Sequence, residues 1–282
     1  MSAPLRAAIH LDLDGAADIF RVHGWPYPQK GGPDPLFDSG LPRALDFFDE
    51  EGVKATLFVI ARTVEDTLAC SRLRDAVARG HEVASHTITH RLLTRLSSDE
   101  KREEIGSSRK KIEDALGVSV IGFRAPSFDI DRESLELVAQ SGYAWDSSLQ
   151  PSARSAASVE LDHVSPAPSR ILPGQSLIEL PMPQHAPLPF PFHPSYSLVF
   201  GGAYFALGLR RFRRIRAPLV LLFHLTDLAD PVPRQFASSL ASRFFTLSFL
   251  SGDLKRARCS RMLARVRDAY TIVETPALLD SV

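Results

Sequence analysis

The sequence predicts an α/β fold: a single barrel-like domain over residues 1–282, with about seven mostly parallel strands. Over the first two-thirds of the chain, short apolar runs typical of strands alternate with helical patterns, and this alternation favours parallel strands joined by helices. The run at 53–60 is mostly apolar, as expected for a strand covered on both faces. The chain has no internal repeat and no obvious linker, and its length suits one α/β barrel.

The first elements follow from local patterns. Residues 7–13 form an apolar strand. The segment from about Gly15 to Gly40 is polar and rich in proline and glycine, so it is predicted to be a long loop with a functional role. The helix at 41–50 precedes the strand at 53–60. A second helix then ends near Gly80, a residue type suited to a helix C-terminus.

Capping signals mark the next helices. Ser97 and Glu100 form a capping box, and Gly117 closes the charged helix that they begin. The elements predicted in this part are strands at 82–85 and 119–123, and helices at 97–116 and from Asp131 to about 142.

The last part of the chain is less regular, and residues 147–195, rich in proline and serine, carry only a weak pattern. Two helical stretches separate the last two strands. The strands predicted in this part lie at 143–145, 178–180, 219–223 and 270–273.

Composition excludes several classes of protein. The apolar fraction of 44% and the charged fraction of 23% are ordinary for a globular protein, and a formal net charge of zero does not favour nucleic acid as a partner. Cys70 and Cys259 are isolated, so no paired metal or redox motif exists, and two free thiols are the favoured interpretation. Residues 1–6 enter a strand directly and no long apolar run is present, which predicts a cytoplasmic protein.

Two short clusters carry potential metal chemistry, and each follows a predicted strand. The first is Asp12-Leu13-Asp14 and the second is His86-Thr87-Ile88-Thr89-His90. Two imidazoles and one carboxylate suit a divalent metal such as Zn²⁺, and the other carboxylate could take a proton from water. Strand alternation puts Asp12 and Asp14 on one face, and a helical 86–90 segment would put both histidines on one face. Taken singly, the clusters could also be a turn and two surface histidines.

A third group of polar residues follows the strand at 119–123. Pro126 stiffens the turn Arg124-Ala125-Pro126-Ser127, so Arg124 would be held at the same rim, where its guanidinium could orient Asp12 and keep it ionised. A surface arginine is the alternative.

A histidine ends the strand at 219–223. His224 could donate a proton to a leaving amine, although a structural histidine fits equally well. Asp146 and Asp227 also lie near strand ends. Either could hold a histidine in its protonated form, and Asp146 could instead cap a turn.

In this order, these segments resemble the NodB-homology polysaccharide deacetylases, carbohydrate esterase family four. Asp12-Leu13-Asp14 is similar to the first motif of that family, His86–His90 to the second, Arg124–Ser127 to the third, and Leu222-Phe223-His224 to the late motif with the acid. Residues 52–58 also resemble the second strand of the family.

The resemblance implies a distorted (β/α) barrel and a metal-dependent hydrolysis of an N-acyl group, usually acetyl, from an amino sugar. Asp12 would be the base and His224 the acid. Asp14, His86 and His90 would hold the divalent metal, expected to be Zn²⁺. Apart from the resemblance, Pro126, Ser127, Asp146 and Asp227 are predicted to contact the substrate.

The first motif departs from the usual form of the family, in which the two aspartates are adjacent. Here Leu13 separates them. This spacing resembles a branch that contains cytoplasmic peptidoglycan-deacetylase-like proteins, allantoinase-like proteins and lipid-linked aminoarabinose deformylases. The departure affects the prediction of the substrate more than the prediction of the reaction type.

Two further segments bear on the substrate. Residues 190–216 combine many apolar side chains with clustered arginine, a pattern that suits contact with a membrane surface and hence a lipid-linked sugar. A buried helix followed by a solvated basic turn is the slightly favoured alternative. In the segment 20–37, Trp25 with its aromatic neighbours could stack on a sugar ring or pack within the loop.

Three rival functions stay open. Two histidines and a carboxylate also form the facial triad of non-haem iron oxygenases, but that triad is expected on a different, all-strand fold. A hydrolase of cyclic amides, similar to allantoinase, and a binding protein with a decayed site are the others.

Overall fold

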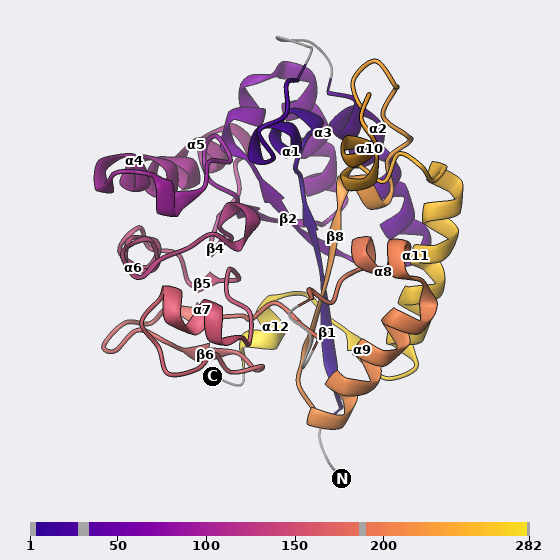
Figure 1. Ribbon diagram of the computed structural model, residues 1–282. Helices are drawn as coiled ribbons and strands as arrows, with labels where there is room; N and C mark the ends of the chain where they lie inside the picture. Colours follow the sequence, from indigo (N-terminus) through magenta and orange to yellow (C-terminus); the bar gives the residue numbers. More distant parts are fainter. Residues whose placement is uncertain (1–3, 28–33, 186–189, 281–282) are drawn as a thin grey trace.

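The computed structural model describes residues 4–27, 34–185 and 190–280. These residues form one curled sheet with helices on its outside (Figure 1). The strand order is β6-β7-β5-β4-β3-β2-β1-β8, with β9 paired to the start of β1, and every pairing is parallel except β6–β7. The strands are β1 (Arg6–Asp12), β2 (Ala55–Val59), β3 (Glu82–Ser85), β4 (Gly122–Phe123), β5 (Trp145–Asp146), β6 (Ser169–Arg170), β7 (Ile178–Glu179), β8 (Leu219–His224) and β9 (Thr271–Ile272).

Helices connect most of these strands. The α-helices are α1 (Ala16–Val22), α2 (Pro35–Glu50), α3 (Thr67–Ala78), α4 (Ser98–Arg102), α5 (Ser108–Leu116), α6 (Arg132–Gln140), α7 (Ala153–Ser158), α8 (Pro194–Phe200), α9 (Gly202–Ile215), α10 (Leu240–Phe245), α11 (Gly252–Arg267) and α12 (Pro276–Leu279). Short 3₁₀ turns are η1 (Ala61–Glu65), η2 (Leu93–Arg95), η4 (Pro126–Phe128) and η5 (Leu225–Asp227), and η3 (Glu103–Ser107) is a π-helical turn. The α/β class and its parallel sheet are confirmed, and the curled, open sheet matches a distorted barrel.

Alternation along the strands separates the core from the site. On β1, Ile9 and Leu11 face the large apolar core beneath the helices, whereas His10 and Asp12 face the inside of the curled sheet. The same division holds on β8, where Leu221 faces the core. The inner face of the sheet is therefore where polar side chains gather.

The segment at 15–40 is the main correction to the predicted elements. Its described residues form α1 and the first part of α2 rather than one long loop. Asp34 joins the two helices, because its carboxylate accepts hydrogen bonds from the backbone N–H groups at the start of both. A Cβ at Gly15 would lie 2.6 Å from Asp34 Oδ2, so this packing needs a glycine there.

The remaining differences are local. The capping box of Ser97 and the left-handed Gly117 are confirmed, but a π-helical turn interrupts the helix between them. About seven strands were predicted, and the described residues contain nine; β6, the antiparallel partner of β7, is one that no pattern signalled. Both cysteines are free and buried. Among the described helices, none has the length and apolar character needed to cross a bilayer.

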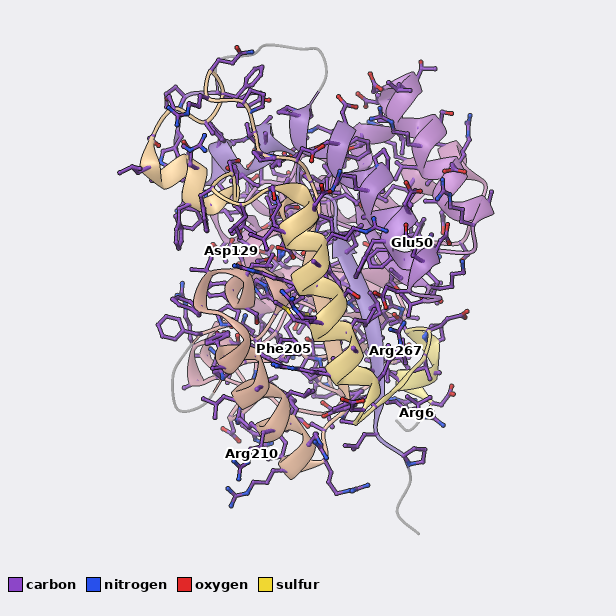
Figure 2. The ribbon with its side chains drawn as sticks, turned by 90° about the vertical axis from the view of Figure 1, so that its right-hand side faces the viewer. Arg6, Glu50, Asp129, Phe205, Arg210 and Arg267 are labelled. Carbon is purple, nitrogen blue, oxygen red and sulfur yellow. The ribbon has the colours of Figure 1, made fainter. Side chains whose placement is uncertain are left out.

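The apolar side chains of 190–216 pack mainly inward, as the favoured alternative predicted. Phe192, Phe205 and Phe212 are fully buried, while Leu207 is 64% exposed. The arginines differ from that prediction, because most of them lie on α9 itself rather than in a turn after it. Figure 2 shows Arg210 at the same end of the molecule as Arg6, which begins β1.

Candidate active site

The parallel register of β1 brings the first cluster to the site. Asp12 pairs with Phe58 on β2 and with His224 on β8, so a carboxylate and an imidazole from distant parts of the chain end neighbouring strands. Leu13 turns into the core and is 1% exposed. Asp14 then returns to the same side as Asp12, as the alternation predicted.

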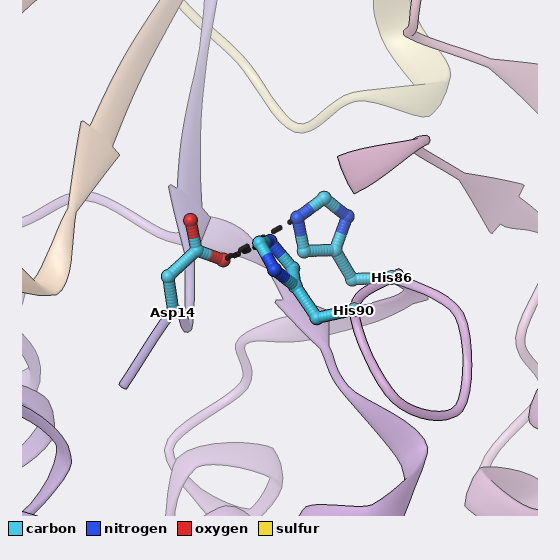
Figure 3. Close-up of side chains that lie close together, drawn as sticks. All are labelled: Asp14, His86 and His90. Atoms are coloured by element: carbon cyan, nitrogen blue, oxygen red, sulfur yellow. Dashed lines mark ion pairs between the residues drawn. The ribbon is translucent and has the colours of Figure 1, made fainter. Parts of the chain in front are cut away.

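Three side chains converge just beyond these strand ends (Figure 3). Asp14 Oδ1 lies 3.4 Å from His86 Nε2 and 3.2 Å from His90 Nε2. All three ligand atoms lie within 4.8 Å of one another. Burial alone would raise the pKa of Asp14, but the two histidines hold it well below its usual value. The sequence clusters are thus one site in space.

The donor set fits a divalent transition metal. Within the described residues, Asp14 Oδ1, His86 Nε2 and His90 Nε2 are buried and have no hydrogen-bond partner. Such atoms are costly unless something binds them. Two atoms that each lie about 2.0–2.1 Å from a tetrahedral zinc ion are about 3.3 Å apart, which is close to both observed separations. Three protein ligands would leave a fourth position for water or substrate.

The histidine segment is not helical, so that part of the expectation was wrong. Thr87 and His90 have left-handed backbone angles, with φ of 65° and 59°. The loop is fastened to η1, because the N–H groups of Ala61 and Arg62 donate to the carbonyls of Thr87 and Ile88. A tight loop rather than a helical face therefore turns both imidazoles toward Asp14.

Glu104 supports the same loop from the π-helical turn, and no sequence signal pointed to it. Its side chain is buried, and Oε2 accepts hydrogen bonds of 2.8 Å from the backbone N–H groups of Ile88 and Thr89. The Thr89 hydroxyl donates to Oε1. One carboxylate thus fixes the backbone between the two histidines.

Arg124 is a fully buried cation at the centre of the site. It donates to Asp12 Oδ1 at 2.6 Å, to the Ser147 carbonyl at 2.9 Å and to His10 Nδ1 at 2.7 Å. Its guanidinium also lies 3.8 Å from the centre of the Phe58 ring. Burial, and then Arg124, hold the pKa of His10 well below its usual range, so His10 accepts this bond as a neutral imidazole. Arg124 therefore orients Asp12 as its position in sequence predicted.

The backbone at Arg124 links the residues around Asp12 to the candidate metal ligand His86. His86 Nδ1 donates to the Arg124 carbonyl at 2.7 Å, and this bond leaves Nε2 of His86 free to bind a metal. Pro126 is buried and begins η4, and Ser127 lies in the left-handed region with φ of 54° at the edge of the cavity.

His224 lies on the other side of Asp12, with Nε2 3.9 Å from Asp12 Oδ2. Asp227 accepts the backbone N–H of His224 at 2.9 Å. The side chains of these two residues are joined through Ser195, whose hydroxyl lies 3.0 Å from His224 Nδ1 and 3.0 Å from Asp227 Oδ2. Asp227 thus reaches the imidazole, but indirectly.

Two other predicted residues have different surroundings. Asp146 accepts from both the N–H and the hydroxyl of Ser148, the turn that had been the alternative, and its carboxyl interacts with that of Glu179. Trp25 stacks on His23 and packs against Phe20. Within the described chain His23, not Trp25, lines the cavity.

The site opens into a cavity of about 1050 Å³, lined by Asp14, Ser127, Phe128, Asp129, Gln184, His185, His193, Ser195, Tyr196, His224 and Phe245, among others. Figure 2 places Asp129, on this cavity, away from the end of the molecule where Arg6 and Arg210 lie. Both polar and aromatic side chains line it, which suits a ligand that has polar groups and an apolar face.

Sequence reasoning missed His10 and His193. His10 could have been found, because it precedes Asp12 by two residues on an apolar strand and must share its face. His193 is buried next to His224, with ring centres 5.1 Å apart, and burial followed by His224 and Arg124 lowers its pKa well below the usual value. His193 lies within the weakly patterned segment 147–195, which offered no signal for it.

Part of this chain is similar to proteins named as deacetylases. Residues 32–145 match the family model described as polysaccharide deacetylase. The chain is 33% identical over 118 residues to chitin deacetylase 1 of Cryptococcus neoformans, covering 42% of this chain and 24% of that protein. It is 26% identical over 140 residues to the peptidoglycan deacetylase of Helicobacter pylori, covering 47% of each. The chain spans less than half the length of these curated relatives.

Solved structures extend the likeness in fold to the whole chain. A structure described as a polysaccharide deacetylase from Mycobacterium smegmatis has a TM-score of 0.65 and 20% identity, covering 100% of this chain and 94% of that one. Puue allantoinase has a TM-score of 0.64 and 13% identity, covering 97% and 88%. At such identities these structures show the fold alone.

Together, the fold and the site define a distorted (β/α) barrel with a candidate metal centre at the ends of its parallel strands. Residues 32–145 are similar to the polysaccharide deacetylase family, and parts of the chain are similar to proteins named as deacetylases. Leu13 separates the two aspartates of the first motif. That this spacing marks a particular branch stays a prediction.

Proposed function

We propose that this protein is a metal-dependent hydrolase that removes an N-acyl group, in the first place N-acetyl, from an amino sugar. The observation that carries the proposal is the convergence of Asp14, His86 and His90 beside Asp12 and His224 at one cavity. Relatives named as chitin and peptidoglycan deacetylases, which match part of this chain, support acetylated glycans as the substrate class.

The residues present suit each step of amide hydrolysis. A divalent metal such as Zn²⁺, held by Asp14, His86 and His90, would polarise the amide carbonyl and make water more acidic. Asp12 takes the proton of the attacking water, and its Oδ2 is free for this role because Arg124 occupies Oδ1. The C–N bond then breaks, and His224 gives the Nε2 proton to the departing nitrogen.

Two substitutions separate the roles of these groups. We expect Asp12→Asn to lower turnover by about 10²–10⁴-fold, the typical share of a general base, while zinc stays bound. We expect His86→Ala to lose both zinc and turnover, because a ligand is gone. The assay is acetate release from N-acetylated sugar oligomers, together with zinc content per chain. Near-normal turnover of Asp12→Asn would show that another group is the base.

The same panel tests the alternatives. Formate release from N-formylated amino sugars would indicate the deformylase-like branch, and ring opening of allantoin would indicate a cyclic amide hydrolase. The likeness in fold to Puue allantoinase motivates the second substrate. A chain that binds zinc and turns over none of these would instead support a binding protein.

A peripheral contact with anionic lipid is a finer part of the proposal. It is supported by a second cleft near the start of β1, which Arg210, Arg213, Arg214 and Arg265 line. The first three have no salt bridge within the described residues, in contrast to arginines such as Arg43, Arg72, Arg79 and Arg256. Arginine without a protein partner suits phosphate groups of lipids.

The position of this cleft limits what lipid binding there could do. It lies near the start of β1, whereas Asp14 lies beyond its end. A lipid-linked substrate would therefore have to reach the cavity by other contacts. Co-sedimentation with anionic vesicles at low salt tests the contact. Arg213→Glu/Arg214→Glu should lose binding, and the equal charge change Arg102→Glu/Lys110→Glu on α4 and α5 should not. Absence of binding by the unaltered protein would refute this part.

Cytoplasmic location also stays a proposal. Cell fractionation with antibodies to the protein would test it, and recovery outside the cytoplasmic and inner-membrane fractions would contradict it.

A further inference from the structure

We propose that Ser195 is a positioning residue: its hydroxyl relays Asp227 to His224 and holds the imidazole as the Nδ1–H tautomer, so that protons are exchanged at Nε2. The catalytic consequence rests on the proposed function. The tautomer itself does not, and it can be measured in the absence of any substrate.

The hydrogen-bond geometry carries the inference. Ser195 Oγ lies 3.0 Å from both His224 Nδ1 and Asp227 Oδ2. A hydroxyl has one proton to donate. The Asp227 carboxylate can only accept, so this proton goes to Asp227 and the Ser195 oxygen accepts from Nδ1–H of His224. The three groups thus form one chain of hydrogen bonds, in which His224 donates to Ser195 and Ser195 donates to the buried carboxylate of Asp227.

Buried or packed residues fix both Asp227 and Ser195 in this chain of hydrogen bonds. Asp227 is fully buried, and the same oxygen that accepts from Ser195 also accepts the His224 backbone N–H at 2.9 Å. Ser195 lies in α8, on the wall of the cavity. Because α8 and η5 are in contact, the relay joins two segments whose sequence separation gives no hint that they meet.

Asp12 favours the other tautomer of His224, but its influence is weaker than that of Ser195. Asp12 Oδ2 would favour a proton on Nε2, but it lies 3.9 Å away, beyond hydrogen-bond distance, whereas Ser195 is at 3.0 Å. The other titratable groups near the relay are His193, Lys255 and Cys259, whose thiol lies 3.8 Å from the Asp227 carbonyl oxygen. Lys255 is buried in α11 and donates to the Thr226 carbonyl, and burial lowers its pKa to about 8. Within the described part of the chain, none of these groups forms a hydrogen bond with the His224 imidazole.

The tautomer decides which nitrogen of His224 exchanges a proton with the substrate. In the charged imidazole, Nδ1–H stays bonded to Ser195 and Nε2–H points to the side of Asp12. When Nε2 gives its proton to the departing nitrogen, the ring becomes the neutral Nδ1–H form without any rearrangement. Without Ser195, the neutral ring could carry its proton on Nε2 and would have to be reprotonated at the wrong nitrogen.

Nitrogen-15 NMR of the imidazoles tests the relay directly. In zinc-loaded protein at a pH where the ring is neutral, we expect Nε2 of His224 to have the shift of an unprotonated nitrogen and Nδ1 that of a protonated one. His224→Gln identifies the signals. Ser195→Ala should move the proton toward Nε2, Ser195→Thr should restore the original pattern, and Ser197→Ala, a hydroxyl of the same helix bonded to the His193 carbonyl, should change nothing.

A wild-type His224 with its neutral proton on Nε2, or a Ser195→Ala protein with an unchanged tautomer, would overturn the relay. The activity arm follows from the proposed function: kcat for acetate release should fall by about 10-fold in Ser195→Ala, part of the contribution of a general acid, with KM nearly unchanged. A wild-type protein that releases no acetate but has the expected tautomer would refute the function and leave the relay standing.

Discussion

Glu104 offers a sharp test of how the candidate metal centre is held. The loop between His86 and His90 depends on its carboxylate, which accepts two backbone hydrogen bonds of 2.8 Å at Oε2. Replacement by alanine leaves the N–H groups of Ile88 and Thr89 without this acceptor. Hydrogen bonds to a charged group contribute about 1.5–3 kcal/mol each.

The expected loss is smaller than the sum of both bonds, because Ile88 and Thr89 are half-buried and water can reach them in part. We expect Glu104→Ala to lower the free energy of unfolding by about 2–3 kcal/mol, or the melting temperature by about 4–8 °C. Zinc affinity should fall by about 10–100-fold, as for other groups that orient metal ligands. Urea unfolding and competition with a chromophoric chelator measure the two quantities.

Two variants make the result specific. Glu103→Ala removes a neighbouring, exposed carboxylate that bonds only to Ser107 in the described chain, so it should change neither quantity. Glu104→Gln can still accept both backbone bonds through one oxygen and should lose less than about 10-fold in zinc affinity. If Glu104→Ala and Glu103→Ala bind zinc equally well, the loop does not depend on this carboxylate.

Three further results are expected. Asp34→Ala should cost about 2–4 kcal/mol in urea unfolding, because one carboxylate caps two helices, and a loss below about 1 kcal/mol would contradict this role. Burial and then Asp146 raise the pKa of Glu179 well above its usual value, so its stabilising contribution is complete below its unfolded pKa and falls as pH rises. Glu179→Gln should therefore gain stability relative to wild type between pH 5 and 8, and a gap independent of pH would refute this. Zinc at about 100 times its Kd should add about 2.7 kcal/mol to wild type and nothing to His86→Ala, as monitored by thermal unfolding.

Regular patterning explains which parts of the fold could be predicted. Strands such as β1 and β8 have apolar residues at every second position toward the helices, and Ser97, Gly80 and Gly117 carry the local signals of helix ends. These features depend on near neighbours in sequence. The composition of 15–40 hid α1, because Asp34 caps that helix across 17 and 18 positions. The start of α2 did have a local signal, Asp34 as N-cap followed by Pro35, which the composition of the segment obscured.

The site residues also fall into those that local patterns predict and those that depend on contacts distant in sequence. Asp12, Asp14 and His224 follow from strand ends, whereas the shape of the 86–90 loop depends on contacts with Ala61 and Glu104 that no local pattern contains. A spacing of four is satisfied by one helical turn and also by a loop with left-handed residues, so spacing alone could not choose between them. His193 and Ser195 reach the cavity only because α8 packs against β8 and η5.

The leucine between the two aspartates explains why this first motif works on a straight strand. Leu13 is 1% exposed and packs in the core, so the residues on either side of it must face the inside of the sheet. The parallel register places Asp12 beside His224. Asp14, two positions further along the chain, lies next to His86 and His90 in the loop that follows β3. Moving Asp12 one position along this strand would place its carboxylate among apolar side chains, without Arg124. In this chain the Asp-Leu-Asp spacing and the parallel register act together, and a change to either would separate Asp12 from the cluster of Asp14, His86 and His90.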